Sequence, residues 1–119
     1  MLDLSNHGSA IIVFAMEGCG ACDHYVPRLV AQAEQLKAQG YPFVVYQEGM
    51  AVHRGAIPIL LYDAASPDVD VQRLADRFHV QATPSTILVT RGEGAFKCEG
   101  ALANNQIDWI LMMANETNK

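Results

Sequence analysis

Six consecutive apolar residues, Ile11 to Met16, form the first strong pattern along the chain. A short continuous apolar run is typical of a strand that is buried on both faces of a sheet. The preceding residues 1–9 are polar and contain a glycine, so we expect a short lead-in or one helical turn there. The run therefore predicts a strand in a sheet that helices cover.

A helical pattern follows, from Cys19 to about Gln39. Apolar residues recur in it at the spacing of one helix face: Tyr25, Leu29, Ala33 and Leu36. Gly40 is placed where a helix commonly stops. Pro27 lies inside the pattern, where it removes a backbone hydrogen bond and is expected to kink the helix. A helix that begins later, near Pro27, is the alternative.

Two strand-like runs come next, at 43–46 and 57–62. The segment 47–56 between them contains two glycines, which favour a loop or irregular turn. We expect His53 and Arg54, in this segment, to belong to a solvated loop.

The segment 63–67 is expected to be a loop, and Asp68 or Asp70 is placed to cap the helix after it. An amphipathic helix is predicted by apolar residues at helical spacing: Val71, Leu74, Ala75 and Phe78.

The last third of the chain predicts a hairpin and a helix. Strands at 85–89 and 95–99 are separated by a turn at 91–94, which favours an antiparallel pair. Asn104 or Asn105 is expected to cap the final helix. Its apolar face is formed by Ile107, Ile110, Leu111 and Ala114.

Strands and helices therefore alternate along the chain before the hairpin. This order predicts an α/β sandwich with parallel strands first and an antiparallel hairpin near the C-terminus. A length of 119 residues suits one domain, so we expect a single unit over 1–119.

Composition narrows the class of protein. Hydrophobic residues make up 50% of the chain and charged residues 18%, as in ordinary globular proteins. A net charge of −5 with scattered basic residues argues against a nucleic-acid partner. No apolar run reaches the roughly 20 residues of a membrane helix, and the N-terminus lacks the pattern of a secretory signal. Three cysteines do not make a disulfide framework, so we expect a cytoplasmic protein with no membrane partner.

The candidate chemistry lies in Cys19-Gly20-Ala21-Cys22, where the first strand ends and the helix begins. Residues three apart share a helix face, so the two sulfurs can close a disulfide or stand apart as thiols. The helix N-terminus carries partial positive charge and unpaired N–H groups, which favour the ionised, nucleophilic form of Cys19. A redox-active pair is the favoured interpretation.

Half of a zinc or iron–sulfur site, or two unrelated core cysteines, are the alternatives. A zinc site needs about four ligands, and no second pair with ligand spacing exists. The remaining candidates are scattered: Cys98, His7, His24, His53 and His79. We therefore expect no metal and no cofactor. Cys98, on a predicted strand, is expected to be a packed residue rather than a third redox centre.

Several segments together resemble the thioredoxin superfamily. The resemblance rests on residues 19–22 after a buried strand, Pro27 five residues later, residues 78–84, Gly92, residues 100–102 and Gln106. It implies a thioredoxin-like three-layer α/β/α sandwich with a mixed central sheet.

The resemblance also implies site residues. The family proline that matches Pro84 is cis and lies against the active-site disulfide, and X–Pro bonds are where cis peptides occur. The backbone of Thr83 would then pair with an extended substrate. Gly20, Ala21 and Gly100 complete the implied substrate-binding surface. A trans proline at the start of an edge strand is the alternative.

The chain departs from the family pattern beside the cysteines. Ala15 and Gly18 replace the family's tryptophans, and Val13 matches the buried aspartate that assists proton transfer in thioredoxin. Proton handling for the second cysteine must then use water or a neighbour. His24 and Glu17, close in sequence, are candidate proton relays.

The N-terminal half departs as well. Only eighteen residues precede Cys19, too few for the family's leading strand and helix, and the region 41–62 is longer than its counterpart. We expect a shortened N-terminus, an insert around 41–62, and an edge strand supplied by 43–46 or 57–62.

These features predict a thiol–disulfide oxidoreductase that reduces protein disulfides. Cys19 attacks a target disulfide, Cys22 resolves the mixed disulfide, and a reductase or a small thiol resets the pair. The alternative is a thioredoxin-fold binding module or subunit, which the lost tryptophans and acid favour. A metal- or cluster-binding protein, the third hypothesis, would carry zinc or colour when purified.

Overall fold

A computed structural model describes residues 4–52 and 55–118 of the chain. His53 and Arg54 lie outside the described residues. The elements, in chain order, are a 3-10 turn at Leu4–Asn6, β1 Ser9–Ala15, α1 Gly20–Ala38, β2 Phe43–Gln47, β3 Ile57–Asp63, α2 Val69–Arg77, β4 Ser85–Thr90, β5 Glu93–Glu99 and α3 Asn104–Thr117. No described helix is long and apolar enough to cross a membrane.

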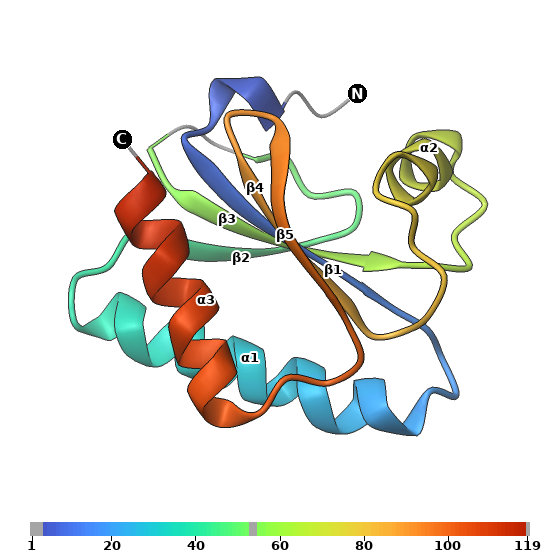
Figure 1. Ribbon diagram of the computed structural model, residues 1–119, viewed down its shortest axis with the longest axis horizontal. Helices are drawn as coiled ribbons and strands as arrows, with labels where there is room; N and C mark the ends of the chain where they lie inside the picture. Colours follow the sequence, from blue (N-terminus) through green and yellow to red (C-terminus); the bar gives the residue numbers. More distant parts are fainter. Residues whose placement is uncertain (1–3, 53–54, 119) are drawn as a thin grey trace.

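The five strands form one mixed sheet in the order β2-β3-β1-β4-β5 (Figure 1). Strands β2, β3 and β1 run parallel, whereas β4 is antiparallel to β1, and β5 to β4. Parallel strands followed by an antiparallel hairpin are the predicted arrangement. The open choice about the edge is settled, because β2 lies at the edge and β3 lies between β2 and β1.

Helices cover both faces of the sheet, which makes three layers (Figure 1). Successive side chains of a strand point to opposite faces, so Ile11 and Val13 face one layer while Ile12 and Phe14 face the other. All four are at most 1% exposed, as the continuous apolar run predicts.

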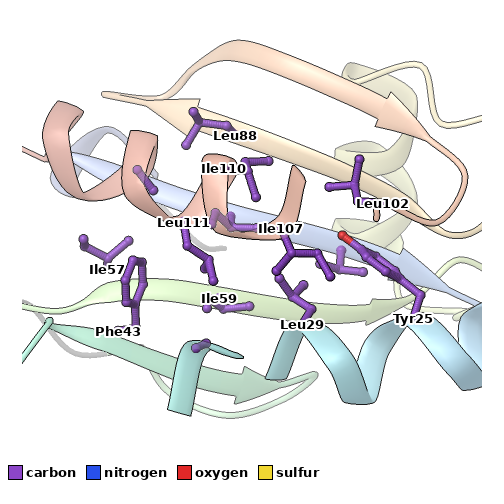
Figure 2. Close-up of a cluster of buried hydrophobic side chains, with 14 residues drawn as sticks. Tyr25, Leu29, Phe43, Ile57, Ile59, Leu88, Leu102, Ile107, Ile110 and Leu111 are labelled. Carbon is purple, nitrogen blue, oxygen red and sulfur yellow. The ribbon is translucent and has the colours of Figure 1, made fainter. Parts of the chain in front are cut away.

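Each face has its own core. The α1/α3 core, between α1, α3 and the sheet (Figure 2), consists of Ile11, Val13, Tyr25, Leu29, Ala33, Phe43, Ile57, Ile59, Leu88, Leu102, Ile107, Ile110, Leu111 and Ala114. The α2 core, on the opposite face, consists of Leu4, Ala10, Ile12, Phe14, Tyr46, Leu60, Val71, Ile87 and Val89. The predicted apolar faces of all three helices therefore point into the molecule.

Helix α1 begins at Gly20 and continues through Pro27, so the alternative of a late start near Pro27 is wrong. Cys19 is the N-cap rather than the first helical residue. The helix ends at Ala38, and Gly40 follows with φ +101°, a conformation that glycine adopts at helix ends.

Of the predicted helix caps, the one for α2 is confirmed and the one for α3 is wrong. Asp68, not Asp70, caps α2, since its side chain accepts the Asp70 N–H. For α3, the prediction of Asn104 or Asn105 is wrong. The N-cap is Ala103, whose N–H is bound by the Gln106 side chain at 2.9 Å. The Asn104 side chain instead accepts a hydrogen bond from Arg28 on α1.

Candidate redox site

Cys19 occupies the N-cap of α1 with an extended backbone (φ −85°, ψ 105°). Its Sγ accepts the Cys22 N–H at 3.2 Å, and its carbonyl accepts the Asp23 N–H at 3.1 Å. A cap side chain normally satisfies an unpaired N–H of the first turn through oxygen, and here sulfur takes that place. Gly18, with φ +80°, turns the chain so that the cap forms directly after β1.

The two cysteines form a disulfide across a Cα–Cα distance of 5.2 Å. They differ in exposure, because Cys22 is 3% exposed whereas Cys19 is half-buried. The outer sulfur is thus the one that an incoming molecule reaches first.

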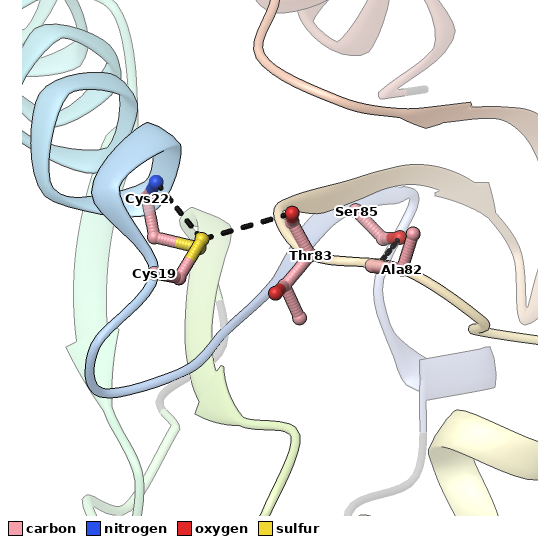
Figure 3. The surroundings of a disulfide bond; sticks show 5 residues. All are labelled: Cys19, Cys22, Ala82, Thr83 and Ser85. Carbon is pink, nitrogen blue, oxygen red and sulfur yellow. Dashed lines mark hydrogen bonds between the residues drawn. A yellow bond between two sulfur atoms is a disulfide. The ribbon is translucent and has the colours of Figure 1, made fainter.

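The loop between α2 and β4 faces the disulfide (Figure 3). The Thr83 carbonyl oxygen lies 3.7 Å from Cys19 Sγ, and the Thr83–Pro84 peptide bond is cis. The Ser85 hydroxyl, at the start of β4, donates a hydrogen bond to the Ala82 carbonyl at 2.5 Å and so holds the loop to the strand. Residues 64 positions apart in sequence therefore meet at one sulfur atom.

Gly100 is joined to the same loop, because its N–H donates to the Pro84 carbonyl at 2.7 Å. With φ +103°, Gly100 turns the chain between β5 and α3. Gly20 and Ala21 are exposed on the first turn of α1. The structure thus gathers Cys19, Thr83, Pro84 and Gly100 at one end of the sheet, with the two exposed helix residues beside them.

The two proposed proton relays are placed less closely. His24, in the first turns of α1, and Glu17, before the helix, are both exposed. Val13, at the position of the family's buried acid, is 1% exposed and pairs with Leu61 across β3. On its other side, Val13 pairs with Thr86 of β4.

Sequence reasoning missed one buried polar pair behind the site. Tyr25 Oη and Thr86 Oγ1 are 2.8 Å apart, and both residues are fully buried. Burial raises the pKa of the Tyr25 phenol above its usual value. The sequence placed Tyr25 on the apolar stripe of α1 but gave no signal for its partner. The pair ties α1, three residues after Cys22, to the strand that begins directly after Pro84.

Cys98 lies on β5 opposite Thr86, half-buried at the margin of the α1/α3 core. It is a free cysteine. Among the described residues, no group of three or more histidine, cysteine or acidic side chains is placed to hold a metal ion.

A disulfide-forming pair at a helix N-terminus, on a mixed sheet with helices on both faces, defines a redox-type site on a thioredoxin-like fold. The family described as the thioredoxin-like domain matches residues 4–115, and the chain belongs to it. No curated protein sequence matches the chain.

Solved structures give the same fold at low identity. Thioredoxin from Fasciola hepatica is 16% identical with a TM-score of 0.63, covering 92% of this chain and 85% of that one. Oxidised thioredoxin from Plasmodium falciparum is 14% identical with a TM-score of 0.62, covering 93% and 86%. Thioredoxin from Malassezia sympodialis is 13% identical with a TM-score of 0.64, covering 92% and 76%. The predicted family and fold class are confirmed.

Proposed function

We propose that this protein reduces disulfides of protein substrates by dithiol–disulfide exchange through Cys19 and Cys22. The observation that carries the proposal is the setting of Cys19 Sγ, which accepts the Cys22 N–H at 3.2 Å at the start of α1. An N–H that points at sulfur and the helix dipole both favour a thiolate over a thiol. In the reduced protein, Cys19 is thus the nucleophile.

The exchange takes two balanced steps. The Cys19 thiolate attacks one sulfur of the target disulfide, forming a mixed disulfide and releasing the other target sulfur as a thiolate, which takes a proton from water. Cys22 then loses its proton and attacks Cys19 Sγ, which releases the second target thiolate. Two electrons have passed to the target, and Cys19 and Cys22 are joined.

The substrate chain binds beside Cys19 in this proposal. Thr83 offers its backbone to an extended segment, in the manner of an added strand. Its carbonyl oxygen is 3.7 Å from Cys19 Sγ, so a segment paired there brings its own sulfur near the nucleophile. Gly20, Ala21, Pro84 and Gly100 line the approach.

A reductase or a small thiol resets the pair in a reducing, cytoplasmic compartment, transferring two electrons back to the disulfide. Proton delivery to Cys22 proceeds through water or through His24 or Glu17. Titration of both thiols in the wild type and in His24→Ala tests the histidine, because a relay predicts a shifted curve for Cys22.

Insulin-disulfide reduction tests the proposal directly. Cys19→Ser is expected to abolish activity, because serine lacks a nucleophile of comparable acidity. Cys22→Ser is expected to accumulate the mixed disulfide, visible as an added mass. Cys98→Ser is the matched control and should reduce insulin at the wild-type rate. Full activity of Cys19→Ser would rule the proposal out.

A binding module with little turnover is the second candidate, favoured by the apolar Val13 and the small Ala15 at family positions of an acid and a tryptophan. The reduction potential of the Cys19–Cys22 pair separates the two. A potential within the range of cellular dithiols supports the reductase. A pair that cellular reductants cannot open supports the module.

A further inference from the structure

A pocket of about 320 Å³ lies beside the proposed redox site. Val13, Ala15 and Leu61 are among the apolar residues that line it. Glu17, two residues before Cys19, and Val26, one helical turn after Cys22, also line it. Residues that precede and follow the cysteine pair along the chain therefore contribute to the lining of the pocket.

The topology places this pocket where open α/β sheets commonly bind ligands. Strand β1 connects through α1 to β2 on one side, whereas β3 connects through α2 to β4 on the other. The two connections leave neighbouring parallel strands in opposite directions and cover opposite faces (Figure 1). The crevice at the carboxyl ends of such strands is a favoured binding position. Ala15 and Asp63, which pair at the ends of β1 and β3, line the pocket.

Ala15 contributes only a methyl group to the lining of the pocket, at a position where the thioredoxin pattern has a tryptophan. Ala15 belongs to the same face as Val13, and Leu61 pairs with Val13 on the neighbouring strand. An apolar surface of this kind suits the methylene stem of a long side chain.

Charge decides which side chain fits. Three carboxylates line the pocket, Glu17, Glu48 and Asp63, and none of its described lining residues is a lysine, arginine or histidine. Glu48 accepts the Ser66 hydroxyl at 2.5 Å, and Asp63 accepts the Ala65 N–H at 2.8 Å. These neutral donors orient the two carboxylates without cancelling their charge. An apolar surface with acidic groups around it matches lysine or arginine.

We propose that this pocket receives a lysine or arginine side chain of the target protein, next to the target's reactive disulfide. The stem lies along Val13, Ala15 and Leu61, and the cationic head meets the carboxylates. The inference rests on the proposed function, and it names the class of substrate: disulfides flanked by a basic residue.

Synthetic peptide disulfides test it with the reduced full-length protein. Four peptides differ in one residue beside the cysteine, which is lysine, norleucine, alanine or glutamate, and the second-order rate of reduction is measured for each. We expect the order lysine, norleucine, alanine, glutamate. Norleucine over alanine reports the apolar stem, and lysine over norleucine reports the charge.

Two variants of the pocket carboxylates remove a charge while they preserve side-chain size and hydrogen bonding. Glu48→Gln and Asp63→Asn are each expected to lower the lysine-to-norleucine rate ratio about threefold, the scale of one exposed ion pair. Glu34→Gln is the matched control. It removes the same charge on α1, about 22 Å further along the helix than Cys19, which exceeds the ~8 Å screening length. Its ratio should equal that of the wild type.

Ala15→Leu tests the pocket independently of charge. It fills the space and is expected to abolish the norleucine-over-alanine preference. Equal rates for the four peptides would overturn the inference. A lysine preference that neither Glu48→Gln nor Asp63→Asn changes would overturn it as well. A further measurement compares cysteamine with mercaptoethanol as the reductant of the oxidised protein. If the charge of the reductant changes the rate there while the charge of the peptide changes no rate, the pocket serves the electron donor, and the inference is also overturned. No reduction of any peptide would instead overturn the proposed function.

Discussion

The helices on the two faces of the sheet differ in length and in the number of residues that they bury. On one face, α1 is 19 residues long and buries Cys22, Tyr25, Leu29 and Ala33, and α3 packs beside it. On the other face, α2 is nine residues long, and Val71 is its buried residue. The same sheet thus carries a large core under α1 and α3 and a smaller helix contact under α2.

This difference teaches how the site is assembled. Cys19 and Cys22 belong to the helix of the large core, whereas Thr83 belongs to the loop that follows α2. Regions with few buried contacts open locally at lower free energy than the core. In the proposed function, the attacking cysteine would therefore belong to the helix of the larger core, and the loop that pairs with substrate would follow the shorter helix.

Truncation of one core residue on each face should give the largest effect and the clearest contrast. Leu29 is completely buried, so Leu29→Ala is expected to lower the free energy of unfolding by about 2–5 kcal/mol. Val71, 6% exposed, loses fewer carbon atoms than leucine does, and Val71→Ala should lower the free energy of unfolding by about 1–2 kcal/mol. Urea unfolding of the reduced proteins measures both.

Equal losses in the two variants would contradict the contrast between the faces. Amide exchange in the wild type supplies a second measurement. Amides of α2 should exchange through openings of lower free energy than those in the middle of α1.

Removal of the buried Tyr25–Thr86 contact should have the next effect. Tyr25→Phe keeps the ring in the α1/α3 core but leaves the Thr86 hydroxyl without its partner, which costs about 1–2 kcal/mol. Thr86→Val in the same background removes the orphaned hydroxyl and should recover part of the loss. A double-mutant cycle by urea unfolding isolates the pair, and additive losses would show that the hydrogen bond contributes nothing.

The fold was largely predictable because its signals are local. The run 11–16 is apolar at every position, and its inner residues are indeed buried on both faces. The order of β2 and β3 was not predictable, since both runs are short and apolar. Pro58 lies on the inner strand β3 although proline lacks a ladder donor. It is the second residue of β3 and is nevertheless buried.

The site was predictable in part for the same reason. Cys19 and Cys22 stand in one local motif, so their geometry follows from the helix start. The approach of Thr83 came only from the family resemblance, because no local pattern joins residues 64 apart. The α3 cap failed because the Asn104 side chain binds Arg28 on another helix. The pocket beside Ala15 depends on three strands and a helix, which spacing along the chain cannot place.

Stability at alkaline pH offers another comparison of the two faces, because each face has a tyrosine whose pKa is raised. Burial raises the pKa of Tyr25, on the α1/α3 face, and burial together with Glu48 and Asp68 raises that of Tyr62, packed against the α2 core. The folded state therefore favours the neutral phenols. Their contribution to stability is complete below the unfolded pKa of about 10 and is lost as pH rises through the folded values.

Tyr25→Phe should consequently lose less stability than the wild type between neutral and alkaline pH. The two unfolding curves are expected to converge above pH 10 or so. Tyr62→Phe provides the matched variant for the opposite face. Parallel curves for wild type and Tyr25→Phe would mean that this phenol does not titrate differently in the folded and unfolded states.

Cys98→Ala should have the smallest effect on stability, and it tests whether the α1/α3 core extends to the edge strand β5. Cys98 packs at the margin of the α1/α3 core on the edge strand β5, where it is half-buried. Its sulfur has a weak contact with the Glu99 carbonyl at 3.8 Å, so truncation removes little. We expect a change in unfolding free energy of about 0.5 kcal/mol or less. A loss comparable to that of Leu29→Ala would show that the core reaches the outer edge of the sheet, and the contrast between the faces would then need to include β5.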